Sequence, residues 1–229
     1  GMMMKMKLFS ALMALSLAGM AQAATEGKDY QVLAKPIPQV QTDKVEVLEF
    51  FGYFCVHCYH LDPVLLKHSQ SFAKDTYLRT EHVVWQPEMF GLARVAAAVN
   101  SSGLKYQANP AVFKAVYEQK INLADSETFN QWAAAQKGFD GKKLVAAYDS
   151  AANQAQARKM QGLTETYRIE STPMVIVGGK YEVLFNGDYQ NGMRTIDELV
   201  AKVRSERGLK QAGSRVKSKG AALAKSANH

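Results

Sequence analysis

The sequence predicts an α/β fold in which a helical domain is inserted between two sheet-forming parts of the chain. Three observations support this fold class. A strand-like run at 45–51 is followed by helical spacing from Cys55 and by a second strand pattern at 77–85. The stretch from about 87 to 168 contains no convincing strand. Strand patterns then return at 174–185 and lead into a last helical pattern.

The first sheet-forming part has the pattern of a strand–helix–strand unit. The run 45–51 is rich in apolar, β-branched and aromatic residues, which favours a buried strand. Gly52-Tyr53-Phe54 is the expected turn, and the apolar spacing from Cys55 to His68 predicts a helix in which Pro63 should produce a kink. Alternating residues from Tyr77 to Trp85 predict the second strand.

Helix signals divide the middle of the chain into several short helices. Residues 91–100 are rich in alanine and apolar. Asn109-Pro110 is typical of a helix start, with asparagine as the cap and proline in the first turn. Asp125-Ser126 and Asp140-Gly141 predict two further starts, and 151–168 has the spacing of a long helix.

The last part of the chain is predicted to form a hairpin and a helix. Gly178-Gly179 separates two strand patterns at 174–177 and 180–185, which is typical of a tight hairpin. Thr195 and Glu198 have the spacing of a capping box, which predicts a helix from there through about residue 204. The whole order corresponds to a thioredoxin fold with a helical insertion.

The N-terminal residues have the pattern of a cleaved secretory signal. Gly1 precedes Met2 and is expected to be an expression addition. Lys5 and Lys7 are followed by an apolar run at 8–18, which is too short to span a bilayer, and Ala21-Gln22-Ala23 is a small-x-small cleavage pattern. Met20 stands where a lipoprotein signal would need a cysteine. We therefore expect a soluble periplasmic protein whose mature chain begins near residue 24.

The positive charge of the chain belongs to its ends. The formal net charge is +7, but the tail from Arg204 onward has seven basic residues and one acidic residue, so the body is close to neutral. A nucleic-acid-binding domain would carry a basic face on the body itself, so the charge distribution argues against this class. Lysine, serine, alanine and glycine dominate the tail, and we expect it to be disordered.

The only two cysteines form a Cys-Val-His-Cys element at 55–58, where the predicted strand passes into the predicted helix. A structural zinc site needs four ligands, and a c-type haem site needs histidine at position 59, where Tyr59 stands. A structural disulfide stays open, but a loop of about four residues would give only about 2 kcal/mol. Redox chemistry is favoured because a helix N-terminus stabilises a thiolate at Cys55. Cys58 lies one turn further in and should be the more buried sulfur.

Thr172-Pro173, at the start of the first returning strand, is the second candidate feature. A proline removes a backbone donor and leaves the preceding backbone free to pair with an extended peptide. An ordinary strand-start proline is the alternative. Together with the cysteine pair and the element order, we interpret Pro173 as a cis-proline beside the dithiol.

These residues carry a family resemblance. The run 49–58, the helical insertion, Thr172-Pro173 and the 178–181 hairpin resemble DsbA, the periplasmic protein dithiol oxidase, and the overall pattern is similar to the DsbA proteins of Neisseria. The resemblance covers about residues 30–204. It implies a monomer without metal or organic cofactor, which oxidises newly secreted proteins and is recharged by a DsbB-like, quinone-linked oxidase of the inner membrane.

The resemblance also implies a role for each site residue. Cys55 would be the nucleophile, Cys58 the resolving cysteine, and His57 the residue that tunes the thiolate. Thr172, Pro173 and Val56 would contact substrate. Glu49 matches the buried acid beneath the disulfide that could exchange protons with Cys58; an ordinary charge on an edge strand is its alternative.

Two departures from the family pattern affect this site. Val56 stands where the family most often has proline, and Thr80 stands where a lysine often faces the buried acid. We therefore expect Glu49 to lack a lysine partner on the next strand and to be less ionised than in relatives. The competing functions are a disulfide isomerase or reductase, and a peptide-binding chaperone without redox activity.

The predicted division of the chain follows from these elements. Residues 1–23 form the signal, 24–86 and 169–204 the two halves of the thioredoxin domain, 87–168 the inserted helical domain, and 205–229 the tail.

Overall fold

The central strand β2, Val45–Phe51, is buried along its whole length. Apolar side chains of a strand buried on both faces must be covered on both sides, so this strand needs a layer on each face of its sheet. Its neighbours are β3, Thr76–His82, which runs parallel to it, and β4, Met174–Val177, which runs antiparallel. The sheet continues through β5, Tyr181–Val183, to the edge strand β1, Tyr30–Val32.

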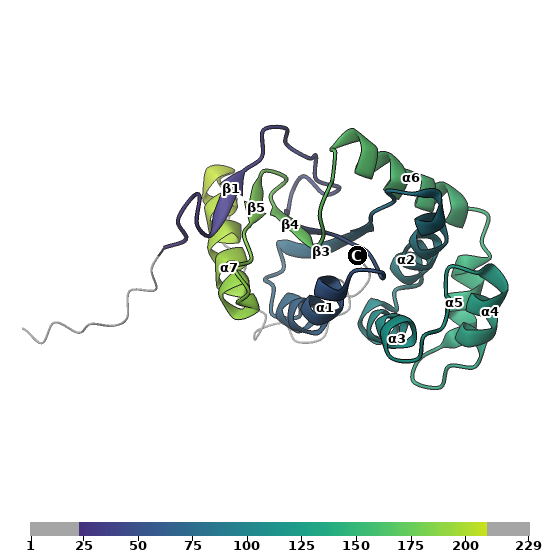
Figure 1. Cartoon of the computed structure of the whole chain (residues 1–229). Helices are drawn as coiled ribbons and strands as arrows, with labels where there is room; N and C mark the ends of the chain where they lie inside the picture. Colours follow the sequence, from purple (N-terminus) through teal and green to yellow (C-terminus); the bar gives the residue numbers. More distant parts are fainter. Residues whose placement is uncertain (1–22, 210–229) are drawn as a thin grey trace, which may run out of the picture.

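The computed structural model describes residues 23–209, and Figure 1 shows their arrangement. The predicted signal segment, except its last residue, and the tail from residue 210 onward lie outside the described residues. Within the described part the strand order is β1-β5-β4-β2-β3. This mixed α/β arrangement confirms the predicted thioredoxin-like fold class.

Seven α-helices complete the described chain. Their bounds are α1 Val56–Ser69, α2 Phe90–Ser102, α3 Lys105–Tyr117, α4 Ser126–Ala134, α5 Gly141–Tyr148, α6 Asn153–Thr166 and α7 Tyr189–Glu206, and a short 3-10 helix covers Pro87–Met89. Helices α1 and α7 pack against β2 and β4 in one apolar core, whereas α2 to α6 lie together at the β3 side of the sheet (Figure 1). The predicted helical insertion therefore lies beside the sheet rather than extending it.

The helical part joins the sheet through the start of α1. One apolar core includes Phe51 and Tyr53 at the end of β2, Cys58 of α1, and buried side chains of α2 to α6 such as Phe113. The ring of Tyr53 lies 5.0 Å from the rings of both Phe51 and Phe113 in edge-on geometry. Because these aromatic side chains are shared, the helical part and the cysteine-bearing helix pack as neighbours.

Two predicted helix starts are wrong. Helix α3 begins at Lys105, directly after Gly103 ends α2 in the left-handed conformation, so Asn109 lies inside the helix and is buried. Helix α7 begins after Asp188, whose side chain accepts from the backbone N–H of Asn191. Thr195 is a buried helix residue there rather than a cap. In both cases a residue type that often caps a helix is used inside one.

The strand predictions differ in smaller ways. Strand β3 ends at His82 rather than Trp85, and β5 is shorter than the predicted run at 180–185. Strand β1 was not predicted, because three residues at a sheet edge give no clear alternation. The predicted starts of α4 and α5 are confirmed, and the side chains of Asp125 and Asp140 accept from backbone N–H groups there.

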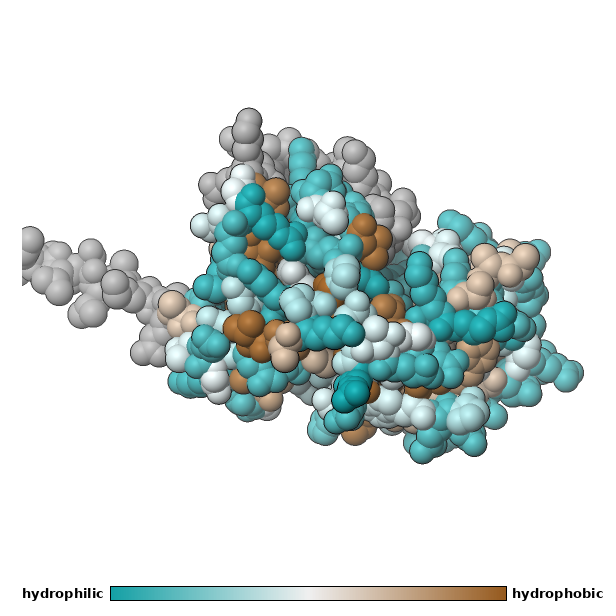
Figure 2. All heavy atoms as spheres, turned by 90° about the horizontal axis from the view of Figure 1, so that it is seen from above, coloured by the Kyte–Doolittle hydropathy of each residue, from teal (hydrophilic) through white to brown (hydrophobic). Residues whose placement is uncertain are grey.

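The surface is mostly hydrophilic with small, separate apolar areas, as Figure 2 shows for one face. The large apolar side chains that are exposed within the described residues are Val32, Val40, Val56 and Trp85. Two of them, Val56 and Trp85, lie near the start of α1 and belong to the site described next.

Candidate active site

Cys55 is held at the N-terminus of α1 by the turn that follows β2. Its backbone N–H donates to the carbonyl of Gly52 at 3.0 Å, and its extended backbone places it as the N-cap residue. Its Sγ then accepts a hydrogen bond from the backbone N–H of Cys58 at 3.2 Å. The sulfur of Cys55 therefore occupies the position where a helix presents unpaired N–H groups.

The same turn is fixed from β3 by His82. The backbone N–H of Tyr53 donates to His82 Nε2 at 3.0 Å, while His82 Nδ1 donates to the carbonyl of Val83. His82 is completely buried, and burial lowers its pKa to about 4. A neutral imidazole with one nitrogen free to accept thus anchors the backbone just before the cysteine pair.

The pKa of Cys55 is lowered to about 6. The largest cause is the hydrogen bond with the Cys58 side chain, which burial partly opposes; the Thr172 side chain and the backbone N–H groups of Cys58 and His57 lower it further. At neutral pH the Cys55 sulfur is mainly a thiolate. The contribution of the backbone groups agrees with the predicted effect of the helix end.

Cys58 has the opposite character. It is fully buried, and its pKa is raised, mainly by burial and then by the hydrogen bond with Cys55 and by the charge of Glu49. Both cysteines are in the reduced form. The pair therefore consists of one accessible thiolate and one buried thiol.

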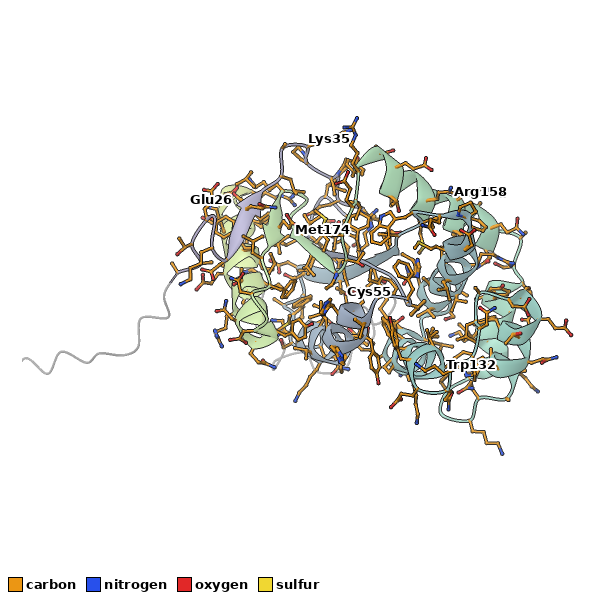
Figure 3. The ribbon with its side chains drawn as sticks, in the orientation of Figure 1. Glu26, Lys35, Cys55, Trp132, Arg158 and Met174 are labelled. Carbon is orange, nitrogen blue, oxygen red and sulfur yellow. The ribbon has the colours of Figure 1, made fainter. Side chains whose placement is uncertain are left out.

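Thr172 and Pro173 lie against Cys55, although more than a hundred residues separate them from it in the sequence. The Thr172–Pro173 peptide bond is cis, and Cys55 Sγ lies 3.6 Å from the carbonyl oxygen of Thr172. Met174 then begins β4, which pairs with β2. Figure 3 shows Cys55 at the end of α1 nearest the sheet, with Met174 on the adjacent strand.

Exposed apolar side chains lie close to the start of α1, where Cys55 stands. Val56 is 46% exposed and Trp85 is 40% exposed, and the ring of Phe54 lies 5.6 Å from that of Trp85. The His57 side chain is exposed, and its carbonyl accepts from the hydroxyl of Tyr189 at 3.4 Å. This surface can accept an extended chain with apolar side chains.

Glu49 lies beneath the cysteine pair, buried in the middle of β2. Burial raises its pKa well above the usual range, and Asp62 raises it further, whereas Lys105 acts in the opposite direction. Its partner in the β2–β3 register is Thr80, whose hydroxyl donates to Asn100 at 3.0 Å. No lysine comes from β3 at this position, but one comes from α3.

Three buried polar residues near Glu49 were missed in the sequence. Asp62 accepts from Asn109 Nδ2 at 2.6 Å, and Asn109 Oδ1 in turn accepts from the hydroxyl of Tyr53 at 2.5 Å. Burial raises the pKa of Asp62 to about 7. Burial lowers the pKa of Lys105 to about 8, against the attraction of the surrounding carboxylates.

The sequence held a signal for one of these residues only. Asp62 lies four residues after Cys58, and residues at this spacing share one face of a helix. Asn109 and Lys105 belong to α3, and a local pattern does not say where such a helix packs. Their contribution to the site follows from the tertiary structure.

Among residues 23–209 no group of three histidine, cysteine or acidic side chains is arranged to hold a metal ion. No helix in this part of the chain has the length and apolar character needed to cross a membrane.

Comparison with known proteins places this site in a family. Residues 46–196 match the family model described as DSBA-like thioredoxin domain. The thiol:disulfide interchange protein DsbA of Pseudomonas aeruginosa is 31% identical over 213 residues, which cover 88% of this chain and 98% of that protein.

Two solved structures from Neisseria meningitidis are also similar. Its oxidoreductase NmDsbA3 is 70% identical with a TM-score of 0.73, covering 80% of this chain and 99% of that one. Its reduced DsbA1 is 56% identical with a TM-score of 0.80, covering 82% and 100%. The match extends over both sheet-forming parts and the helices between them, so the chain belongs to the DSBA-like thioredoxin domain family and is a thiol–disulfide oxidoreductase.

Proposed function

We propose that this chain is a periplasmic dithiol oxidase that transfers the Cys55–Cys58 disulfide to reduced cysteines of newly secreted proteins through a mixed disulfide. The observation that carries the proposal is the opposite perturbation of the two sulfurs. A low pKa makes Cys55 a good leaving group. Because Cys58 is buried, its sulfur can react only with a disulfide that includes Cys55.

The reaction consists of two exchanges. A substrate thiolate attacks Cys55 Sγ of the disulfide, which forms a substrate–Cys55 bond and expels Cys58 as a thiolate that takes up a proton. A second substrate thiolate then attacks the substrate sulfur bonded to Cys55, which forms the substrate disulfide and expels the Cys55 thiolate. The substrate loses two electrons, and the protein ends as a thiolate–thiol pair.

The stability of this final state explains the direction of transfer. Hydrogen bonds at the helix N-terminus stabilise the Cys55 thiolate only when the pair is reduced, so they make the disulfide more oxidising. The same reasoning applies to DsbA, the family's type member, which is a strong oxidant because its reduced form is stabilised.

Substrate contacts are proposed for the residues that surround Cys55. The carbonyl of Thr172 lies beside the sulfur, and Pro173 lacks a backbone donor, so an extended substrate can pair with the backbone at this point. Val56 would contact apolar substrate side chains. His57 would tune the thiolate through its backbone N–H, which already acts on Cys55.

Glu49 is proposed as the buried acid that exchanges a proton with Cys58. Burial raises the pKa of Glu49 well above the usual range, and the charge of its ionised form raises the pKa of Cys58, so the two groups are coupled.

The partners and the compartment follow from the family. Reduced secreted proteins would be the substrates, and a DsbB-like, quinone-linked oxidase of the inner membrane would restore the disulfide. The chain would act as a monomer. Residues 24–86 and 169–204 would form the redox domain, with 87–168 as its inserted helical domain.

Trapping of the intermediate tests this proposal. The Cys58→Ser variant, with Cys55 activated as its 5-thio-2-nitrobenzoate disulfide, is mixed with a peptide that contains one cysteine. The peptide thiolate should displace the coloured thiolate and stay bonded to Cys55, as mass spectrometry of a digest would show. The Cys55→Ser variant is the matched control and should bind no peptide. Failure to form the Cys55 adduct, with peptide binding kept in the absence of both cysteines, would instead support a redox-inert chaperone.

A further inference from the structure

A cavity of about 290 Å³ lies between β3 and the helices α2, α3 and α6. Its lining includes Thr80, Glu81, Asn100 and Lys105, and its rim includes the exposed Lys159. None of the residues proposed to contact substrate contributes to it. The cavity thus reaches the interior from a part of the surface separate from the cysteine pair.

Lys105 connects this cavity with the buried carboxyls beneath Cys58. Its side chain lines the cavity, yet the residue is only 5% exposed. Its ammonium group is attracted by Glu81, Glu49 and Asp62, and the attraction partly offsets the effect of burial, which lowers the Lys105 pKa to about 8. A single side chain therefore faces solvent in the cavity and carboxyls in the interior.

The charges around this cluster come from four elements. Glu49 of β2, Glu81 of β3 and Asp62 of α1 face Lys105 of α3. Arg79 of β3 lies between two carboxyls, 3.0 Å from Glu81 and 3.2 Å from the buried Glu46 of β2, so its charge is shared and does not neutralise Glu81 alone.

In the part of the chain that the structure describes, Lys105 is the one positive charge that acts on both Glu49 and Asp62, and it faces Glu81 as well. If Glu49 and Asp62 were both ionised, the pair would keep a net negative charge, because Lys105 is the one positive charge acting on them among the described residues and the Cys55 thiolate adds a negative charge near Glu49. Two carboxyls that share a buried site cannot both ionise easily. One Asp62 oxygen, Oδ2, also has no hydrogen-bond partner among residues 23–209, which suits a protonated carboxyl or an exchanging proton.

We propose that Lys105 is a positioning residue of the disulfide exchange: from α3 its positive charge keeps one carboxyl of the Glu49–Asp62 pair ionised, so that the pair holds one proton rather than two, and the cavity it lines is the route by which that proton exchanges with solvent. This inference rests on the proposed oxidase function and adds to it a charge partner and a solvent path.

Protons balance in both directions of the exchange. When substrate expels Cys58 as a thiolate, the pair gives its proton to that sulfur, and Lys105 stabilises the two carboxylates until water in the cavity restores the proton. When the dithiol is oxidised again, Cys58 returns a proton to the pair as its sulfur attacks the disulfide bonded to Cys55. Ionisation of the pair is thus required for the second direction.

The rate of the resolving step, in which Cys58 attacks the mixed disulfide on Cys55, reports on the ionisation of the Glu49–Asp62 pair. Cys55 is converted to its mixed disulfide with glutathione, and release of glutathione by Cys58 is followed at a series of pH values. Removing a facing positive charge raises a carboxyl pKa by about one unit or more. Lys105→Met should therefore move the midpoint of the rate profile upward by about one pH unit, and below the midpoint the rate should fall about tenfold.

Two further variants distinguish the effect of losing the positive charge from an effect on folding. Lys105→Arg keeps the positive charge and should restore the midpoint. Lys114→Met removes an exposed lysine from the same helix and should leave the midpoint unchanged. An unchanged midpoint in folded Lys105→Met, or an equal shift in Lys114→Met, would overturn the proposal. A wild-type chain that releases no glutathione at any pH would contradict the oxidase function itself.

A measurement on the wild-type chain covers the case in which Lys105→Met does not fold. Carboxyl carbon resonances of Glu49 and Asp62 are titrated by NMR in the reduced and oxidised states. The proposal requires one of the two groups to titrate near neutral pH with a midpoint that depends on the redox state. Two carboxyls that are both ionised at about pH 5, or both protonated at about pH 9, would overturn it.

Discussion

Ionisation of Cys55 should make the stability of the reduced protein depend on pH. The folded-state pKa of Cys55 is about 6, below its ordinary value of 9.0. A group whose pKa is depressed by folding stabilises the folded state at high pH, and this stabilisation is lost as the pH falls through the folded pKa. The reduced protein should therefore gain stability between about pH 5 and pH 7.

The size of this gain follows from the same pKa. At pH 7 the Cys55 thiol is mostly ionised in the folded protein and mostly protonated in the unfolded protein. Because pH 7 lies about one unit above the folded-state pKa, ionisation adds about 1.4 kcal/mol to the free energy of unfolding. The Cys55 sulfur is only half-buried, and solvent screening reduces this figure. We expect a difference of about 1 kcal/mol in the free energy of unfolding.

Urea denaturation of the reduced protein at the two pH values measures the difference. The matched control is Cys55→Ser, because serine can still cap α1 through its oxygen but does not ionise. The gain from pH 5 to pH 7 should be about 1 kcal/mol larger in the wild type than in this variant. Equal pH dependence in the two proteins would refute the assignment of a thiolate to Cys55.

Three further predictions concern residues around the site and the helical part. Asn109→Ala leaves Asp62 without its amide donor and should cost about 2 kcal/mol in urea unfolding; a loss below about 0.5 kcal/mol would contradict the buried network. Thr172→Val removes a hydrogen bond and should raise the thiolate pKa, read from thiolate absorbance; an unchanged or lower pKa would argue against that bond. At Gly141 a Cβ would overlap the backbone of α4, so Gly141→Ala should lower the thermal midpoint, whereas Gly138→Ala, in open space, should not; equal midpoints would contradict this packing.

The elements around the cysteine pair could be predicted because their signals are local. The buried run of β2 and the apolar spacing after Cys55 specify a strand and a helix without reference to distant residues. The cysteine spacing at that junction then points to the chemistry. The Gly178-Gly179 hairpin is confirmed for the same reason, since both glycines adopt positive φ in the turn.

Other elements could not be predicted because tertiary partners decide them. Asn109 is a good helix cap in isolation, but its amide is held between Tyr53 and Asp62, and α3 starts four residues earlier. Thr195 likewise donates to a carbonyl inside α7. Capping signals are reliable only where no buried partner competes for the side chain.

At the candidate site, the positive charge that faces Glu49 could not be predicted either, because a tertiary contact supplies it. Thr80 at the register position opposite Glu49 led to the expectation that no lysine would face that acid from β3, and none does. The lysine comes instead from α3, which begins at Lys105, nearly fifty residues after the redox motif. Sequence comparison along one strand cannot reveal a charge supplied by another element.

The redox equilibrium of Cys55–Cys58 with glutathione tests the central claim most directly. Fluorescence of Trp85, near the active site, follows the reduced fraction, and thiol trapping checks it independently. The account predicts that the protein is largely reduced under conditions in which glutathione remains mostly oxidised, because the Cys55 thiolate stabilises the dithiol. A disulfide that glutathione cannot open, or an equilibrium that favours the oxidised protein, would contradict the account.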